Sequence, residues 1–157
     1  MRIGNGFDVH KFTKNRELFL GGIKIPYELG LEGHSDADVL LHAICDAILG
    51  AIGLGDIGLH FPDNDLSYKN IASKELLKKT NKMLKDKSYK ICNIDATIIA
   101  EKPKISPYRD KIKQNIANIL NIDFEKINIK ATTTEQLGFI GRKQGIAAMC
   151  VVLIDNI

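Results

Sequence analysis

The sequence predicts a single α/β (α+β) domain over residues 1–157: a mixed four-stranded sheet packed by helices on one face, plus a small N-terminal hairpin. Three observations lead to this prediction. A chain of 157 residues is long enough for one hydrophobic core. Segments with strand patterns alternate with segments of helical periodicity. The hydrophobic content of 45% is ordinary for a globular protein, and we find no repeat or linker that would divide the chain.

The composition argues against several functional classes. The net charge of +3 is small and the chain has no tryptophan, so a nucleic-acid partner is not indicated. No apolar stretch is long enough to span a bilayer, and no signal peptide precedes Ile3, so we expect no membrane association. We expect a bacterial cytoplasmic protein, or one from the plastid stroma if a transit peptide has been removed. Cys45, Cys92 and Cys150 lie far apart, which favours buried, reduced thiols over disulfides or a thiolate zinc site.

Residues 2–10 predict the first strand, with glycines that allow another backbone to approach closely. Asp8 and His10 are two residues apart, so in a strand both side chains point to the same face. Taken alone, this pair is also explained by a strand whose polar face meets water. Residues 18–25 form two short apolar runs around Gly21-Gly22, which is typical of a hairpin, and residues 26–33 predict a connecting loop.

The next segment predicts a largely apolar helix that ends before Gly53. Ser35 and Asp38 match a capping box at its start, with Ser35 as the N-cap. An anion could dock at this helix N-terminus, but a simple capping serine explains the pattern equally well. Asp38, His42 and Asp46 are spaced four apart, so we expect them on one helical face.

Two histidines and one aspartate would supply three ligands, which is the number that a catalytic zinc uses while keeping a fourth position open. We therefore predict a metal centre at Asp8, His10 and His42. The alternative for His42 is a hydrogen-bonded core histidine, because spacing does not prove that the strand and the helix are neighbours.

Residues 53–58 formally match the G-x-G-x-x-G pattern, but they follow a helix rather than a strand, so we reject dinucleotide binding. The loop offers Asp56, Asp63 and Asp65, carboxylates that suit sugar or polyol hydroxyls. Ordinary exposed turn aspartates are the competing explanation.

The remaining elements follow in order. We predict an amphipathic helix over 70–86, a half-buried strand over 93–98, a loop over 101–107, and a helix that runs from Ser106 as N-cap to about Leu120. Strands over 126–131 and 145–154 complete the sheet. Between these strands lie Thr132-Thr133-Thr134-Glu135, whose hydroxyls, with Lys130 and Arg142, could hold phosphate oxygens. Glu135 could bind Mg²⁺ or Mn²⁺. Threonines are also common in strands.

Several motifs resemble one family along nearly the whole chain: Gly6-Phe-Asp-Val-His10, His34-Ser-Asp-Ala-Asp38, His42-Ala-x-x-Asp46, Gly55-Asp-Ile-Gly58, Phe61-Pro-Asp63 and Lys130-Ala-Thr-Thr-Thr-Glu135. The chain is similar to the 2-C-methyl-D-erythritol 2,4-cyclodiphosphate synthase family of the methylerythritol phosphate route to isoprenoids. The resemblance implies a lyase that cyclises 4-diphosphocytidyl-2-C-methyl-D-erythritol 2-phosphate and releases CMP. It also implies a homotrimer with active sites at the subunit interfaces.

The resemblance further implies zinc, or another divalent transition metal, at Asp8, His10 and His42, and Mg²⁺ or Mn²⁺ placed by Glu135. His34 and Thr133 would stabilise the transition state. Substrate contacts are expected from Asp8, His10, His34, Ser35, Asp56, Ile57, Gly58, Phe61, Pro62, Asp63, Asn64, Asp65, Ala100, Glu101, Lys102, Pro103, Lys104, Ile105, Ser106, Thr132, Thr133, Thr134, Glu135, Phe139 and Arg142. Two alternatives stay open: another zinc-dependent phosphotransferase or phosphohydrolase, and a non-enzymatic binding module that uses a lysine-rich surface.

Overall fold

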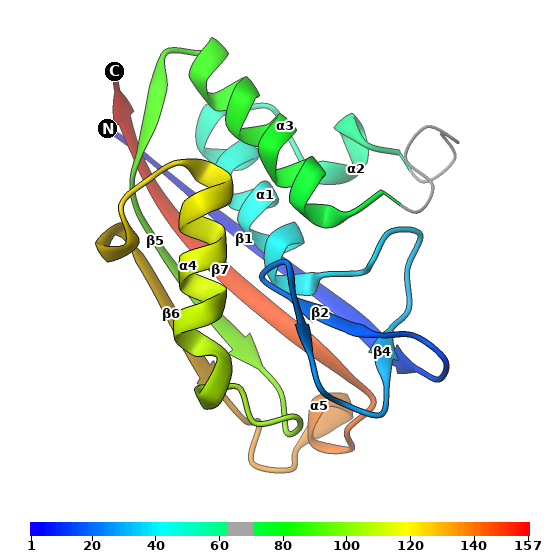
Figure 1. The fold of residues 1–157 in the computed structure, drawn as a ribbon. Coiled ribbons are helices and arrows are strands. Elements are labelled where there is room, and N and C mark those ends of the chain that lie inside the picture. The colour runs from blue at the N-terminus through cyan, green and yellow to red at the C-terminus, as the bar shows by residue number, and fades with distance from the viewer. Residues whose placement is uncertain (63–70) are drawn as a thin grey trace.

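Helices cover one face of a mixed β-sheet (Figure 1) in a computed structural model that describes residues 1–62 and 71–157. The strands are β1 Arg2–Thr13, β2 Leu18–Leu20, β3 Ile23–Ile25, β4 Gly30–Leu31, β5 Tyr89–Ile99, β6 Ile127–Thr132 and β7 Gly145–Asn156. The α-helices are α1 Val39–Ile52, α2 Ile57–His60, α3 Ser73–Asp86, α4 Arg109–Leu120 and α5 Gly138–Gly141. Short 3₁₀ helices span Ser106–Tyr108 and Phe124–Lys126.

In the part of the chain that the structure describes, the main sheet has five strands in the order β4-β1-β7-β5-β6, so the predicted count of four is wrong. The additional strand, β4, is only two residues long and pairs with the end of β1 through Phe12–Leu31 and Thr13–Gly30. A two-residue strand has too few positions to show the alternation of polar and apolar residues. The sequence therefore predicted only a loop over 26–33. All neighbours are antiparallel except β5 and β6, which are parallel, so the sheet is mixed as predicted.

The N-terminal hairpin forms as predicted. Strands β2 and β3 pair antiparallel across Gly21 and Gly22. Both glycines have positive φ angles, 64° and 75°, which a two-residue turn of this kind requires.

Helix α1 lies against β1 and β7 and is covered on its other side by α3 (Figure 1). The predicted helix start is wrong: the N-cap is Asp38, whose carboxylate accepts a hydrogen bond from Leu41 N, and Ser35 lies outside the helix. Ala37 has a positive φ of 55°, which excludes it from a right-handed helix and delays the start. The predicted end is confirmed, because Gly53 caps the helix in the left-handed conformation.

Later elements match the predictions with shifted boundaries. Helix α3 starts at Ser73 rather than 70, and the predicted N-cap role of Ser106 is wrong because it opens a 3₁₀ turn that leads into α4. Cys45 and Cys150 are buried free thiols, whereas Cys92 is half-buried. No helix in residues 1–62 and 71–157 combines the length and the apolar character that crossing a bilayer requires.

The sheet face opposite the helices carries apolar side chains. Gly4 and Gly6 of β1 point toward α1, so the alternating residues Ile3, Phe7 and Val9 point away from it. These three side chains are exposed, as are Met149 and Val151 on the neighbouring strand β7. Phe7 and Met149 are direct cross-strand partners and are 53% and 51% exposed. Among residues 1–62 and 71–157, nothing covers these apolar side chains.

Candidate metal centre

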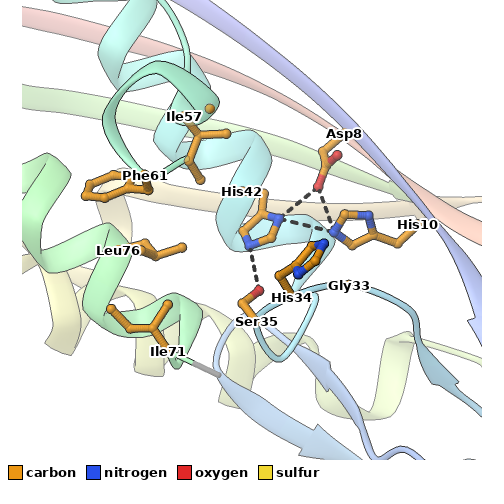
Figure 2. A pocket seen from close by; sticks show the side chains of 11 residues that line it. Asp8, His10, Gly33, His34, Ser35, His42, Ile57, Phe61, Ile71 and Leu76 are labelled. Carbon is orange, nitrogen blue, oxygen red and sulfur yellow. Dashed lines mark hydrogen bonds and ion pairs between the residues drawn. The ribbon is translucent and has the colours of Figure 1, made fainter. Parts of the chain in front are cut away.

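Asp8, His10 and His42 bring three ligand atoms together at the junction of β1 and α1 (Figure 2). His42 Nδ1 lies 3.1 Å from Asp8 Oδ2 and 3.2 Å from His10 Nε2. His10 Nε2 lies 3.5 Å from the same carboxylate oxygen. The prediction that strand and helix place these side chains together is confirmed.

The other polar atoms of the two strand residues are held by the backbone of the residue between them. Val9 N–H donates to Asp8 Oδ1 at 2.9 Å, and His10 Nδ1 lies 2.9 Å from the Val9 carbonyl oxygen. Because a carbonyl can only accept, Nδ1 of His10 carries the proton and Nε2 keeps a lone pair for the centre. The backbone of a single residue, Val9, thus orients two ligands.

The electrostatics favour the metal-binding protonation states of Asp8 and His10, whereas Asp8 favours the protonated form of His42. Burial lowers the pKa of His10, and the charge of Asp8 offsets only part of this effect. Burial raises the pKa of Asp8, but the hydrogen bond with His42 and the two imidazole charges outweigh it, so this pKa lies below 3.8. Burial likewise opposes protonation of His42, yet its contacts with Asp8 raise its pKa above 6.5. At neutral pH the cluster therefore offers an ionised carboxylate and a neutral His10, as metal binding requires.

The spacing of the three atoms fits a tetrahedral ion. Ligands at about 2.0–2.2 Å from a tetrahedral metal lie roughly 3.3 Å from one another. The observed separations of 3.1, 3.2 and 3.5 Å bracket this value. Two imidazole nitrogens and one carboxylate oxygen suit zinc and related transition metals. Within residues 1–62 and 71–157, this is the single cluster of three or more such ligands.

The cluster opens into a cavity of about 220 Å³ with two chemically different sides. Figure 2 shows His34 and Ser35 beside the three ligands, and Ile57, Phe61, Ile71 and Leu76 across from them. Gly33 and Gly58 complete the lining. A molecule here would meet polar groups at one end and an apolar wall at the other, which suits a small phosphorylated compound with a carbon skeleton.

The predicted polar face of α1 is only partly correct. His42 and Asp46 share a half-buried stripe, but Asp46 accepts from Ile57 N at 2.7 Å and holds α2. Asp38 is fully buried and accepts from the backbone N–H groups of Gly21 and Gly22 at 3.0 and 2.6 Å, so it fixes the hairpin. Neither carboxylate orients His42, because both find backbone donors in neighbouring segments.

Of the two explanations left open for the start of the helix, the capping serine is wrong. The Asp38 carboxylate already occupies the N-terminus of α1. Ser35 Oγ accepts from Ala37 N at 3.0 Å and lies 3.4 Å from His42 Nε2. Ser35 nevertheless faces the cavity, beside rather than at the helix terminus.

The predicted contacts in residues 56–65 divide into three groups. Ile57, Gly58 and Phe61 line the cavity. Asp56 caps α2 through Leu59 N at 3.0 Å, and Pro62 is half-buried, but neither is among the lining residues. Asp63, Asn64 and Asp65 lie outside the described residues.

The Thr132–Glu135 segment forms a separate cluster at the ends of the parallel strands β5 and β6. Glu101 Oε1 accepts from Thr134 N at 3.0 Å and Gln136 N at 3.1 Å. Thr133 Oγ1 lies 3.3 Å from Glu135 Oε1. These groups are exposed, apart from half-buried Glu101 and Thr134, and none lines the cavity of the metal cluster. Within one chain, the two sets of predicted phosphate ligands are therefore not brought together.

The remaining predicted substrate contacts are residues 100–106, Phe139 and Arg142, and none of them lines the cavity of the metal cluster. Ala100 N–H donates to the Thr132 carbonyl at 2.9 Å, which joins the 100–106 loop to the threonines. In this loop Ala100 and Ile105 are buried, Pro103 is half-buried, and Lys102, Lys104 and Ser106 are exposed. Phe139 lines a different cavity of about 820 Å³, and Arg142 is exposed and lines neither cavity.

Sequence reasoning missed four residues around the centre. Ile71 and Leu76 fall within the amphipathic helix predicted over 70–86, yet they line the cavity. Ser73 Oγ lies 2.9 Å from His42 Nε2, and Asp36 is hydrogen-bonded to Ser73. Ser73 is 31 residues from His42, so no local spacing could have indicated the contact.

A mixed sheet with one helical layer, a three-ligand metal cluster and an adjoining cavity defines a metal-dependent α/β enzyme. Comparisons with known proteins narrow this class. The model of the YgbB family matches residues 1–155. A relative from Francisella philomiragia, named 2-C-methyl-D-erythritol 2,4-cyclodiphosphate synthase, is 62% identical over 156 residues, covering 99% of this chain and 98% of the relative. The chain belongs to this family.

Solved structures agree with this assignment. The bifunctional IspDF of Campylobacter jejuni has a TM-score of 0.96 and 47% identity; the match covers 99% of this chain and 42% of that longer one. IspF of Plasmodium falciparum, solved as a CDP complex, has a TM-score of 0.87 and 40% identity, with 99% of this chain and 96% of that chain covered.

Proposed function

We propose that this chain converts 4-diphosphocytidyl-2-C-methyl-D-erythritol 2-phosphate to 2-C-methyl-D-erythritol 2,4-cyclodiphosphate and releases CMP, as a single catalytic domain over residues 1–157 acting in the cytoplasm. The observation that carries the proposal is the Asp8–His10–His42 cluster at the polar end of a cavity with an apolar wall. The names of full-length relatives supply the reaction class.

The cavity residues and Glu135 of the Thr132–Glu135 segment have distinct proposed tasks. Asp8, His10 and His42 would hold zinc, and Glu135 would help to hold Mg²⁺ or Mn²⁺. When bound, these ions neutralise phosphate charge that would otherwise oppose the approach of two anionic groups. His34 and Ser35 would bind phosphate oxygens, since both face the cavity next to the cluster. Ile57, Phe61 and Leu76 would hold the carbon skeleton and exclude water.

The proposed reaction forms one P–O bond and breaks another. An oxygen of the 2-phosphate attacks the β-phosphorus, and the bond from that phosphorus to the CMP oxygen breaks. No side-chain nucleophile is needed, because phosphoryl transfer depends on in-line positioning and charge stabilisation. The attacking group is already tethered, so a site that holds the substrate folded can gain on the order of 7 kcal/mol or more from orientation.

We further propose that a second copy of the chain completes each site in a homotrimer. Thr132, Thr133 and Glu135 would contact the phosphates from the neighbouring subunit, with Thr133 acting opposite His34. These three residues do not line the cavity of their own chain, which supports an arrangement in which they serve the site of a neighbour. The uncovered apolar face of β1 and β7 offers a surface that a second copy of this chain would bury.

The cytidine part would extend away from the metal cluster. Asp56 and Gly58 would bind the ribose or nearby hydroxyls, and residues 100–106 would form the cytosine pocket. Support comes from the cavity-lining position of Gly58 and from the Ala100–Thr132 hydrogen bond, which links this loop to the proposed phosphate ligands.

The direct test uses purified protein, the cytidyl substrate, Zn²⁺ and Mg²⁺, with products identified by phosphorus NMR. The cyclodiphosphate and CMP should appear together. Release of inorganic phosphate in place of the cyclodiphosphate would instead support a phosphohydrolase. His42→Ala should abolish turnover while circular dichroism shows an intact fold.

Shared sites are tested by mixing two inactive variants, His42→Ala and Thr133→Ala, under conditions that exchange subunits. If subunits mix at random in a cyclic trimer, about a quarter of the sites regain both intact side chains, so turnover should recover to that fraction. Absence of recovery in demonstrably mixed trimers would contradict the shared site. Light scattering on the wild-type protein gives the oligomeric state.

A further inference from the structure

We infer that Ser73 and Asp36 are positioning residues that make Nδ1 of His42 the metal-binding nitrogen. This inference rests on the metal centre of the proposed function and adds two residues to it. Neither touches the ligand atoms of Asp8 or His10, so each would act only through His42.

The hydrogen-bond directions follow from chemistry. The Asp36 carboxylate can only accept. Ser73 N–H donates to Asp36 Oδ2 at 3.1 Å, and the Ser73 hydroxyl donates to Asp36 Oδ1. The single hydroxyl proton is thereby used, so Ser73 Oγ can only accept from His42 Nε2, 2.9 Å away. His42 then carries a proton on Nε2, which leaves Nδ1, the nitrogen beside Asp8 and His10, as the one that can give up its proton and bind the metal.

Burial makes this chain of hydrogen bonds directional and persistent. Ser73 is 0% exposed, so water does not compete for its hydroxyl. Ser35 Oγ is a second neighbour of His42 Nε2, but it is farther away, at 3.4 Å, and already accepts from Ala37 N. Ser73 is therefore the main partner of this nitrogen.

The same contacts tie the start of α3 to the metal centre. Ser73 is the first residue of α3, and its N-cap Ala72 has no side chain that can cap the helix. Asp36 performs this task from 37 residues away by accepting the Ser73 N–H. A carboxylate at a helix N-terminus is also favoured by the helix dipole. One carboxylate thus anchors α3 and, through Ser73, orients His42.

The test measures zinc affinity of the purified protein by competition with a chelator, for Ser73→Ala, Asp36→Asn and Ser35→Ala. Loss of a hydrogen-bond partner of a metal-binding histidine typically weakens binding about 10- to 100-fold. We expect a loss of this size for Ser73→Ala and Asp36→Asn, and a smaller one for Ser35→Ala. Asp86→Asn, at the exposed far end of α3, is the matched control and should keep wild-type affinity.

Nitrogen-15 NMR of the zinc-loaded wild-type protein provides an independent readout that does not depend on any variant folding. We expect the proton of His42 on Nε2, with slow exchange against water that becomes fast in Ser73→Ala. A proton on Nδ1, wild-type affinity in both Ser73→Ala and Asp36→Asn, or an equal loss in Ser35→Ala would overturn the inference. Failure of the wild-type protein to bind zinc would instead contradict the proposed metal centre itself.

Discussion

Gly6 packs directly against the carbonyl oxygen of Ala43: a Cβ atom built on Gly6 would lie 2.0 Å from that oxygen. Through this contact the backbones of β1 and α1 touch directly. Gly6 is two residues before Asp8 in β1, and Ala43 directly follows His42 in α1. The close approach is what places ligands from two distant segments within bonding reach of one ion.

Gly6→Ala should therefore destabilise the protein by about 2–4 kcal/mol, because β1 and α1 must move apart. It should also weaken zinc binding, since the movement separates Asp8 from His42. Urea denaturation and chelator competition measure the two effects. The matched control is Gly50→Ala in α1, the helix that faces β1, where a Cβ would have Asn5 O at 3.8 Å as its contact. That variant should be about 0.5–1 kcal/mol more stable, owing to the higher helix propensity of alanine.

His42→Ala should lose the metal while keeping the fold. The affinity for zinc should fall by more than the roughly 100-fold that loss of a ligand's hydrogen-bond partner causes. Zinc at 100 times its dissociation constant should stabilise the wild-type protein by about 2.7 kcal/mol and leave the variant unchanged. Elemental analysis and thermal denaturation with and without zinc are the measurements. His60→Ala serves as the control, because the His60 ring contacts the Leu54 carbonyl and not the cluster. Equal zinc content in His42→Ala and wild type would rule out the centre.

The raised pKa of Asp38 should make the free energy of unfolding depend on pH. Burial raises its pKa from 3.8 to about 6, although the N–H groups of Gly22, Leu41 and Gly21 stabilise the ionised form. Between these two pH values the folded protein keeps a proton that the unfolded chain has released. The contribution of Asp38 to stability is therefore complete below about pH 4 and is lost as the pH rises through 6.

The comparison with Asp38→Asn isolates this effect, because asparagine does not titrate. From pH 4 to pH 7 the free energy of unfolding of the wild type should fall, relative to the variant, by at most about 3 kcal/mol. Urea denaturation across this range provides the measurement. A difference between the two proteins that does not change with pH would contradict the raised pKa.

We expect Glu101 to hold the conformation of the Thr132–Glu135 segment. Its carboxylate holds Thr134 N and Gln136 N, and the segment includes Glu135 and Gln136 at positive φ angles of 52° and 65°. Glu101→Gln should release this conformation, because an amide accepts more weakly than a carboxylate. Amide hydrogen exchange at positions 134 and 136 should accelerate, and turnover should fall by up to about 100-fold if the threonines position phosphates. Glu17→Gln, in a surface ion pair with Lys24, should change neither quantity.

The sequence predicted the regular elements well where patterns were long. The hairpin around Gly21-Gly22, the end of the long helix at Gly53 and the mixed character of the sheet are confirmed. It failed where segments were short or where side chains served unexpected partners. The two-residue strand β4 and the cap at Asp38 are such cases, because pairing with β1 and the positive φ of Ala37 decide them.

The sequence by itself determined which side chains could bind a metal: Asp8 and His10 share one strand face, and His42 lies on the partly polar stripe of an otherwise buried helix. Their meeting was decided only by the tertiary structure, through the glycine contacts that seat α1 on β1. The orientation of His42 likewise depends on Ser73 and Asp36, which belong to different segments. Local spacing encodes the direction of a side chain within one element, whereas contacts between elements depend on how the whole core packs.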